Sequence, residues 1–502
     1  MFDQLSEELK KIGIPVIKKP PSLHVNAEEY LCKCLNNRKF PCSMPLQDRD
    51  DPSDELTFFL EKDYKGSEKR CIISCFSPRG SGKTQFIKHY FFKFHEEAIK
   101  HGRVIVRCCD NALNATWMQL VKAGEEGKQP LDHATAGLCE LIRSHVQSVT
   151  GRDQKLSDYD DSDKAYASWI RETNSHFIIP VGVTMDPLIV LDTCEVLGET
   201  DCKHHMHKRK RPGTPYTLLE VFCRAIPAPH KIFVIGCNAR MQYGDVAATL
   251  ANIDKMQPLQ PLSEEAHKNA VVSWGQGAKG WGIDEAVCKP IYHWAAGSPR
   301  LLIESHSKFS GTMSFANGSV KAVYRCFGEF QKRASSLYPI LPEWLPYGVS
   351  CLLTSSTKVK VNNADNCIPI NPDWKKFLGV SWGEGGTFRE AAGRSIGTYV
   401  LKDQLFVVPP IIFSDDVMKR LMVEKYVNGK MERVDNALIM PSQLHPYLSS
   451  EAAAQLGRSS PTERGNLFEK PFVYAVYARY LLAYWERPDS KWVPLPKVFD
   501  GA

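Results

Sequence analysis

Residues 71–84, CIISCFSPRGSGKT, join an apolar run to a glycine-rich loop that ends in lysine and threonine. Backbone N–H groups at a helix N-terminus, helped by one lysine, are a simple way to bind the clustered charge of a triphosphate. In such a loop the glycines curl around the β-phosphate, Lys83 reaches the β- and γ-oxygens, and the Thr84 hydroxyl ligates Mg²⁺. The predicted phosphate-binding residues are Ser77, Pro78, Arg79, Gly80, Ser81, Gly82, Lys83 and Thr84, with Thr84 also a metal ligand.

The first position of this loop departs from the usual pattern, because it holds Ser77 in place of glycine. A small residue can still fit there. The alternative is a chance GKT sequence at the start of a helix. The apolar strand before the loop and the acidic strand described next favour a true phosphate loop.

A second apolar run, PLIVLD at 187–192, ends in a carboxylate. An acid at the end of a strand beside the phosphate loop would hold the magnesium water shell, and we assign this part to Asp192. Glu195 is the candidate general base, although it could also be a solvated residue at the strand exit. The position directly after the acid, where many relatives carry the base, holds Thr193.

A third run, KIFVIGCNAR at 231–240, ends in polar Asn238. Its side chain is predicted to contact the γ-phosphate or the attacking water, which makes it a catalytic candidate. Arg240 is either an arginine finger directed at a neighbouring subunit or an ordinary surface arginine.

Apolar strands and amphipathic helices alternate from residue 69, which indicates an α/β fold with a mainly parallel sheet covered by helices. The expected strands are 71–76, 103–109, 187–192 and 231–237, with a weaker candidate at 255–259. After residue 261 the pattern is helical to about 340. Short strands over 398–413 and a helix over 414–426 follow, and a long amphipathic helix begins near 465.

Composition places the chain among folded, soluble proteins, because 43% of its 502 residues are hydrophobic and 24% are charged. A net charge of +6 is too mild for a dedicated nucleic-acid binder. The first residues lack a signal sequence, and Pro180, Asp186 and Pro187 interrupt the most apolar stretch, so we expect no membrane association. Sixteen scattered cysteines favour a reducing, intracellular location.

The phosphate loop, the acid-ending strand, the polar strand end and the later AAGSPRLL occur in the order that resembles the AAA+ and STAND ATPases. The resemblance covers residues 70–305. It implies a P-loop NTPase sheet of order 5-1-4-3-2 with a helical lid, ATP and Mg²⁺ as cofactors, and a lid residue, Arg300, directed toward the phosphates. A lone arginine held by Gly297 and Pro299 could neutralise charge as the γ-phosphate is lost, although a plain helix-capping turn is the alternative.

Residues beyond the lid resemble the winged-helix module that follows many STAND ATPases. The order of segments, ending in ERGNLFEKPFVYAVYARYLL, is similar to the ATPase-plus-nuclease layout of Crinkler and retrotransposon hot spot proteins. Glu469 alone makes no nuclease site, because metal-dependent nucleases need several carboxylates. The predicted regions are a leader (1–65), a P-loop ATPase core (66–260), a helical lid (261–344), a winged-helix-like α+β region (345–430) and a C-terminal helical, nuclease-like remnant (431–502).

Three functions remain open at this stage. The chain could hydrolyse ATP to drive rearrangement of its lid, act as a nucleotide-operated switch or scaffold with slow turnover, or work as an effector whose C-terminal region binds nucleic acid. A homo-oligomer is also compatible. The basic run KRKR at 208–211 is either a nuclear import signal or a solvated insertion, so the predicted location is nuclear or cytoplasmic. Cys202, His204, His205 and His207 are too close together in sequence to predict a zinc site.

Overall fold

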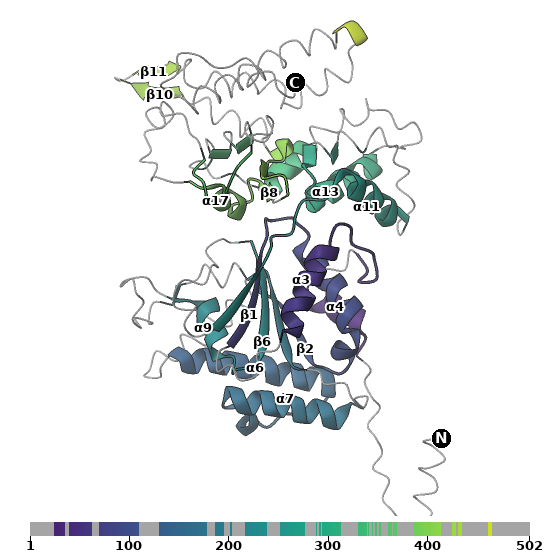
Figure 1. The fold of residues 1–502 in the computed structure, drawn as a ribbon, viewed down its shortest axis with the longest axis vertical. Helices are drawn as coiled ribbons and strands as arrows, with labels where there is room; N and C mark the ends of the chain where they lie inside the picture. Colours follow the sequence, from purple (N-terminus) through teal and green to yellow (C-terminus); the bar gives the residue numbers. More distant parts are fainter. Residues whose placement is uncertain are drawn as a thin grey trace, which may run out of the picture.

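The structure is a computed structural model in which the described residues are 25–35, 40–62, 70–109, 130–177, 186–194, 201–202, 216–237, 251–276, 288, 291–292, 294–312, 330–338, 340, 344, 347–348, 351–352, 360–363, 365–368, 386–400, 402–412, 424–427, 430–433 and 460–463. Figure 1 shows two levels, with the strands of the main sheet below and the helices α11, α13 and α17 beyond the upper ends of those strands.

Five parallel strands form the main sheet, in the spatial order β2-β3-β6-β1-β7. Their bounds are β1 Arg70–Phe76, β2 Val104–Cys108, β3 Leu188–Asp192, β6 Lys231–Gly236 and β7 Ala251–Met256. When these five strands are numbered in chain order and read from the β7 edge, the order is 5-1-4-3-2, as predicted. The α/β P-loop NTPase fold is therefore confirmed. The weak candidate at 255–259 is displaced, because the fifth strand begins at Ala251.

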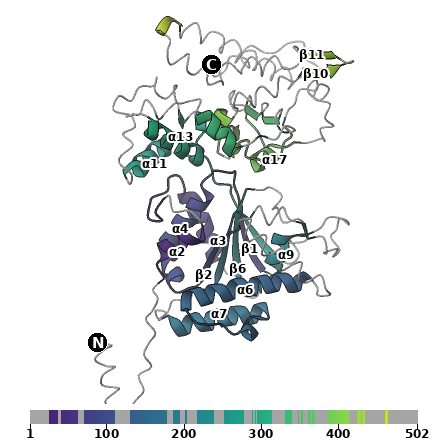
Figure 2. The same cartoon turned by 180° about the vertical axis from the view of Figure 1, so that it is seen from behind.

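Helices cover both faces of the sheet. One face carries α6 Pro130–Thr150, α7 Ser162–His176 and α9 Leu218–Ala225, with the short η1 Leu156–Tyr159 between the first two. The other carries α2 Ala27–Cys34, α3 Asp50–Glu61 and α4 Lys83–Lys100. Figure 2 shows the sheet from behind, with α9 and α4 again on opposite sides of the strands.

The two hydrophobic cores follow from strand alternation, since successive side chains point to opposite faces. Ile72 and Ile232 pack with α6, α7 and α9, whereas Ile73 and Phe233 pack with α2 and α4. The central strands β3 and β6 are buried on both faces, as continuous apolar runs in a parallel sheet require.

The predicted leader region is part of the core structure. Tyr30 of α2 donates a hydrogen bond to the Val104 carbonyl at 3.0 Å, and its hydroxyl accepts one from the Val106 N–H at 3.2 Å. These bonds occupy backbone groups of β2, the edge strand, which would otherwise be open to pairing with another chain. At the opposite edge, Lys62 after α3 pairs with Asp254 of β7 at 2.9 Å. The leader therefore spans the face of the sheet that α4 covers.

Beyond the sheet, the helices α11 Glu264–Gln276 and α13 Pro299–Thr312 agree with the helical pattern expected after residue 261. The later described elements are α17 Phe388–Gly393, the hairpin β8 Thr398–Val400 with β9 Leu405–Val407, η5 Pro410–Ile412, and the hairpin β10 Glu424–Val427 with β11 Lys430–Arg433. A further small hairpin joins β4 Asp201–Cys202 to β5 Tyr216–Thr217.

Two expectations for the later segments have different outcomes. The strands expected over 398–413 are confirmed in part, as the hairpin β8–β9. The helix expected over 414–426 is wrong at its end, because Glu424–Val427 pair with Lys430–Arg433 as strands. The helix expected near 465 lies outside the described residues. Within the described part of the chain, no helix is long and apolar enough to span a bilayer.

Acid should destabilise the fold partly through His145 of α6. Its Nε2 lies 3.0 Å from the Gly102 carbonyl oxygen, and burial lowers its pKa to about 4, although that hydrogen bond acts in the opposite direction. An unfolded histidine takes up a proton below about pH 6.5. The unfolded chain then binds a proton that the folded chain does not, so stability falls as the pH drops from about 6.5 to 4.

For one such histidine the loss approaches roughly 3 kcal/mol. We expect His145→Gln to lower the free energy of unfolding at pH 7 and to flatten its decline between pH 6.5 and 4. Urea unfolding at a series of pH values measures both quantities. Equal slopes for the wild type and the variant would contradict this account of His145.

Candidate nucleotide-binding site

The glycine-rich loop lies between the end of β1 and the start of α4, as the motif requires. Gly80 and Gly82 have φ angles of +83° and +91°, in the left-handed region that favours glycine. Gly82 is the N-cap of α4 and carries no side chain to occupy the first N–H groups of the helix. These backbone donors, with the positive end of the helix dipole, form a ready anion site.

Ser77, the departure from the usual pattern, has a structural reason. Its hydroxyl accepts a hydrogen bond from the Leu259 N–H at 2.8 Å, and its own N–H donates to the Gly236 carbonyl at 3.1 Å. Serine therefore ties the start of the loop to the segment that follows β7. Glycine would have no side chain to accept the Leu259 amide.

Lys83 is buried, with only 8% of its surface exposed. Its ammonium donates to the carbonyl oxygens of Ser77 at 3.1 Å and Pro78 at 3.0 Å, and lies 3.0 Å from the Cys237 sulfur at the end of β6. The lysine thus folds over the loop in which it is expected to bind phosphate. To bind a phosphate oxygen, the ammonium would have to give up one of these three contacts.

Thr84 and Asp192 meet directly. The Thr84 hydroxyl donates to Asp192 Oδ2 at 2.6 Å, and the second carboxylate oxygen accepts the Thr193 N–H at 2.9 Å. Asp192 is 1% exposed, so these hydrogen bonds stabilise a carboxylate that has little contact with water. The two residues predicted as metal ligands are therefore adjacent and held in orientation.

Thr193 has an unusual backbone. Its φ of +60° is rare for a β-branched residue and costs of order 1–3 kcal/mol. The N–H of this residue donates to the carboxylate of Asp192. Glu195 and Asn238, the predicted base and sensor, and Arg240 lie outside the described residues, whose nearest members are Cys194 and Cys237.

The start of α13 contacts the phosphate loop. The Arg300 N–H donates to the Gly80 carbonyl at 3.1 Å, and a Cβ placed on Gly80 would lie 3.0 Å from Arg300 Cβ and 1.8 Å from the Tyr338 hydroxyl. Glycine at position 80 thus allows both the start of α13 and the Tyr338 side chain to lie close to the loop. Arg300 itself lines the cavity described next, and its direction toward the phosphates stays a prediction.

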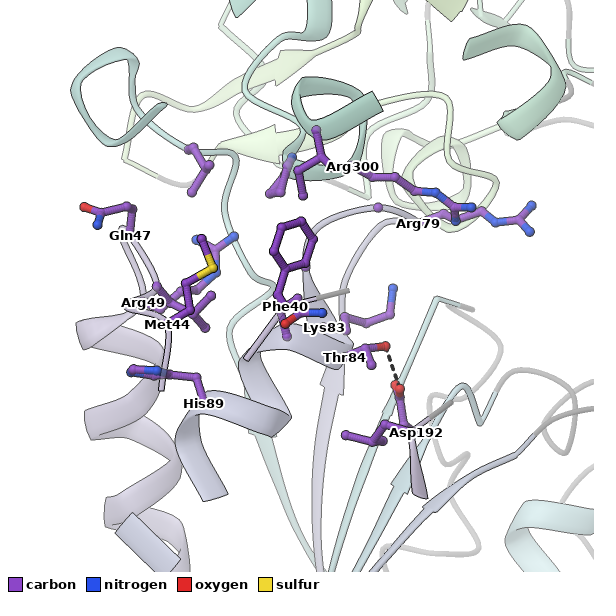
Figure 3. Close-up of a pocket in the computed structure, with 18 of the residues that line it drawn as sticks. Phe40, Met44, Gln47, Arg49, Arg79, Lys83, Thr84, His89, Asp192 and Arg300 are labelled. Carbon is purple, nitrogen blue, oxygen red and sulfur yellow. Dashed lines mark hydrogen bonds between the residues drawn. The ribbon is translucent and has the colours of Figure 1, made fainter. Parts of the chain in front are cut away.

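A cavity of about 550 Å³ joins these parts, a size typical of small-molecule sites. Figure 3 shows Met44, Arg49 and His89 on one side and Thr84 and Asp192 on the other. Residues lining it come from the loop and α4, the strand ends, the leader, the segment before α11, and α13: Leu35, Phe40, Pro41, Met44, Leu46, Gln47, Arg49, Arg79, Gly80, Gly82, Lys83, Thr84, Gln85, His89, Cys108, Asp192, Thr193, Cys237, Leu262, Pro299, Arg300, Ile303 and Glu304.

The sequence prediction missed the leader's part in this cavity. Phe40, Met44 and Leu46 supply an apolar wall, and Arg49 supplies a cation that is 4% exposed. Burial lowers the pKa of Arg49 to about 10, so the side chain stays charged at neutral pH. The only local signal was a single arginine in an acidic stretch directly before an amphipathic helix.

The site has the chemistry that Mg²⁺ with a triphosphate requires. Magnesium in such sites commonly takes one or two protein oxygens and completes its shell with phosphate and water. Thr84 and Asp192 supply a hydroxyl and one carboxylate at the N-terminus of α4. Across the part of the chain that the structure describes, no cluster of three or more metal-binding side chains exists, so an all-protein metal cage is not formed there.

Sheet order, loop geometry and strand-end acid together define the class of this protein as a P-loop NTPase fold. Similar solved structures include a Walker-type ATPase of Pyrococcus abyssi, with 12% identity over 73% of this chain and 95% of that chain and a TM-score of 0.41. The ORC2 protein of Aeropyrum pernix, solved as ADPNP–ADP complexes, has 14% identity over 75% and 93% and a TM-score of 0.38. The ORC1 protein of Aeropyrum pernix, solved in complex with DNA, has 15% identity over 70% and 83% and a TM-score of 0.33.

Sequence identities this low indicate similarity of fold and nothing about function. No protein-family model and no curated protein matches the sequence. The STAND and Crinkler parts of the resemblance stay predictions.

Proposed function

We propose that this protein binds ATP with Mg²⁺ in an AAA+-type site and hydrolyses it to move the α11–α13 region against the core. The observation that carries the proposal is the hydrogen bond from the Thr84 hydroxyl to Asp192. Thr84 directly follows Lys83 at the N-terminus of α4. A hydroxyl, a carboxylate and an ammonium at the mouth of one helix form the set that a magnesium-bound triphosphate needs.

Each residue then has a defined task. The first N–H groups of α4 and the Lys83 ammonium hold the β- and γ-phosphate oxygens. Thr84 and Asp192 would hold Mg²⁺, which neutralises phosphate charge when bound. Arg300, from the start of α13, is close enough to the loop to balance charge at the γ-phosphate, because its own N–H bonds Gly80.

The apolar wall of the cavity supports a nucleoside rather than inorganic phosphate as the ligand. Phe40, Met44 and Leu46 of the leader and Ile303 of α13 line the same cavity as Lys83. An aromatic base loses little by leaving water for such a wall, and ring contacts with Phe40 would add specific stabilisation. We assign this end of the cavity to adenine.

Replacing Asp192 by Asn tests the metal part of the site. The variant keeps the shape of the side chain and can accept the Thr84 hydrogen bond, but it has no charge to hold the metal. We expect Mg²⁺ to tighten ATP binding by about tenfold in the wild type and by less than about twofold in Asp192→Asn. Turnover should fall by about 100-fold. Calorimetry and phosphate release measure these effects.

Asp186→Asn is the matched control, since Asp186 precedes β3 and is exposed, whereas Asp192 ends that strand and is buried. A variant at Asp192 that retained wild-type magnesium dependence would rule out the proposed metal site.

A nucleotide-operated switch is the second candidate, and one observation favours it. Thr193, not a carboxylate, follows Asp192, and its N–H is engaged by that residue. If Glu195 does not activate water, binding is retained while turnover is slow. Tight ATP binding with little turnover, unchanged in Glu195→Gln, would favour the switch; a large loss of turnover in that variant would favour the ATPase.

Partners and location are further proposals. Nucleic-acid binding, assembly into a homo-oligomer, and a STAND-type or Crinkler-like effector role are compatible with the site, as is an intracellular location with KRKR at 208–211 as an import signal. Salt-dependent binding of DNA or RNA by the full chain, with and without ATP, tests the nucleic-acid proposal, because phosphate contacts weaken steeply as salt rises.

A further inference from the structure

Two adjacent leader residues, Asp48 and Arg49, connect the phosphate loop to the helices beyond the sheet. Arg49 Nη2 donates to the Ser81 carbonyl at 2.9 Å. Asp48 Oδ2 accepts the Ser263 N–H at 2.7 Å, and Ser263 directly precedes α11. The Arg49 side chain therefore binds a carbonyl of the loop, and the Asp48 side chain binds the residue before the N-terminus of α11.

The loop end of this connection is a buried charged contact. Arg49 also donates through Nη1 to the carbonyl of Asp48 at 2.7 Å, so its guanidinium fork is fixed from both sides. In a trans peptide the carbonyl of one residue and the N–H of the next point in opposite directions. Holding the Ser81 carbonyl therefore also sets the direction of the Gly82 N–H, one of the amides at the start of α4.

The other end of the connection is equally well defined. Ser263 caps α11: its hydroxyl accepts the Ala266 N–H at 3.1 Å, and its carbonyl accepts the His267 N–H at 2.9 Å. The Asp48 carboxylate takes the N–H of this capping residue. A carboxylate beside a helix N-terminus is favoured by the helix dipole, so the contact holds the start of α11 by charge as well as by hydrogen bonding.

The backbone between the two contacts is strained. Asp48 has φ of +52°, a left-handed conformation that L-residues avoid and that aspartate and asparagine tolerate best. Arg49 is the N-cap of α3, and its carbonyl accepts both the Ser53 N–H and the Ser53 hydroxyl, at 3.0 and 2.6 Å. The dipeptide is thus anchored to a helix and is too constrained to let its two ends move separately.

We propose that Asp48 and Arg49 form a positioning pair that makes the orientation of the phosphate loop and the position of α11 change together. The pair acts in addition to the direct bond from Arg300 N–H to Gly80. A change at the loop on nucleotide binding, which rests on the proposed function, would reach α11 through Arg49, Asp48 and Ser263.

Hydrogen exchange of the full chain without nucleotide tests the pair itself. Asp48→Gly removes the carboxylate and relieves the backbone strain, whereas Asp48→Asn keeps an acceptor and tolerates the positive φ. We expect Asp48→Gly to speed amide exchange about tenfold both in the first turn of α11 and in the loop at 80–84. Asp48→Asn, which loses only the charge, should speed exchange at both places by a smaller factor, about two- to threefold.

Arg49 supplies the reciprocal experiment. Arg49→Ala removes the side-chain bonds to the Ser81 and Asp48 carbonyls and leaves the Asp48 carboxylate to hold Ser263, yet it should also speed exchange at the start of α11. Arg49→Lys, which keeps the charge but cannot donate to Ser81 and Asp48 in one fixed fork, should give a smaller effect of the same pattern and serves if the alanine variant does not fold. Lys62→Ala, which breaks the exposed contact at the far end of α3, should change neither place.

Effects confined to α11 in Asp48→Gly and to the loop in Arg49→Ala and Arg49→Lys would overturn the proposal, because the two contacts would then be independent. A second arm adds ATP or ADP: in the wild type we expect nucleotide to slow exchange at the start of α11, and in Asp48→Gly to lose most of that change. If the wild type binds no nucleotide, the proposed function fails while the first arm still decides on the pair.

Discussion

Lys83→Ala should weaken ATP binding strongly. The ammonium of Lys83 is buried at the N-terminus of α4, where its present acceptors are the loop carbonyls of Ser77 and Pro78. Hydrogen bonds between a buried cation and phosphate oxygens are worth roughly 1.5–3 kcal/mol each. Loss of two such bonds weakens binding by about 100-fold or more. Titration with a fluorescent ATP analogue and calorimetry with ATP itself measure the change.

Lys93→Ala is the matched control for this variant. Lys93 lies on the same helix, but it is exposed and its ammonium contacts the Phe94 ring. We expect its affinity for ATP to match that of the wild type. Thermal unfolding of both variants separates lost binding from lost folding. An affinity of Lys83→Ala within about threefold of the wild type would show that this loop is not the phosphate site.

Gly80→Ala should displace the helical segments that contact the loop. A methyl group at position 80 would lie 1.8 Å from the Tyr338 hydroxyl and 3.0 Å from Arg300 Cβ, and the φ of +83° is strained for alanine. The backbone strain alone costs about 1–2 kcal/mol, and the collision adds to it. We expect a clear loss in the free energy of unfolding without nucleotide, together with faster proteolysis around α13.

Two further variants separate the collision from the strain. Gly82 also has a positive φ, of +91°, but the nearest atoms to an added Cβ lie 3.8 Å away or more, so Gly82→Ala should lose only the strain energy. Tyr338→Phe removes the atom that the new methyl group meets. The double variant with Gly80→Ala should therefore recover part of the lost stability, a coupling that a double-mutant cycle measures. Equal losses for Gly80→Ala and Gly82→Ala would refute the close contact.

Much of the sheet could be predicted because its central strands are buried on both faces. The runs that end in Asp192 and Cys237 are continuous and apolar, which marks them as inner strands. The fifth strand was misplaced because it lacks such a run. Its sequence, ANIDKM, carries Asp254 and Lys255, because β7 is an edge strand. An edge strand needs a less continuous apolar pattern, so periodicity locates it poorly.

The candidate site was predictable where local geometry determines it. Gly80, Gly82, Lys83 and Thr84 lie within one short turn, so their spacing in the sequence already fixes their proximity. Asp192 lies 108 positions beyond Thr84, yet strand-end logic identified it, because parallel strands bring their carboxyl ends to one edge. Arg49 offered no such rule. It reaches Ser81 only because α3 packs across the sheet toward β7.

By itself, the sequence determined the class of fold, the phosphate loop and the acid that faces it, because these depend on apolar periodicity and on glycine positions within a few residues. Tertiary structure alone decided that the leader lines the candidate cavity, that Ser77 is tied to Leu259, that Tyr338 lies against Gly80, and that Asp48 and Arg49 connect the loop to α11. Each of these contacts joins residues far apart in the chain through one hydrogen bond or one close approach. Such contacts depend on how whole helices pack, and this packing cannot be predicted from a local pattern of residue types.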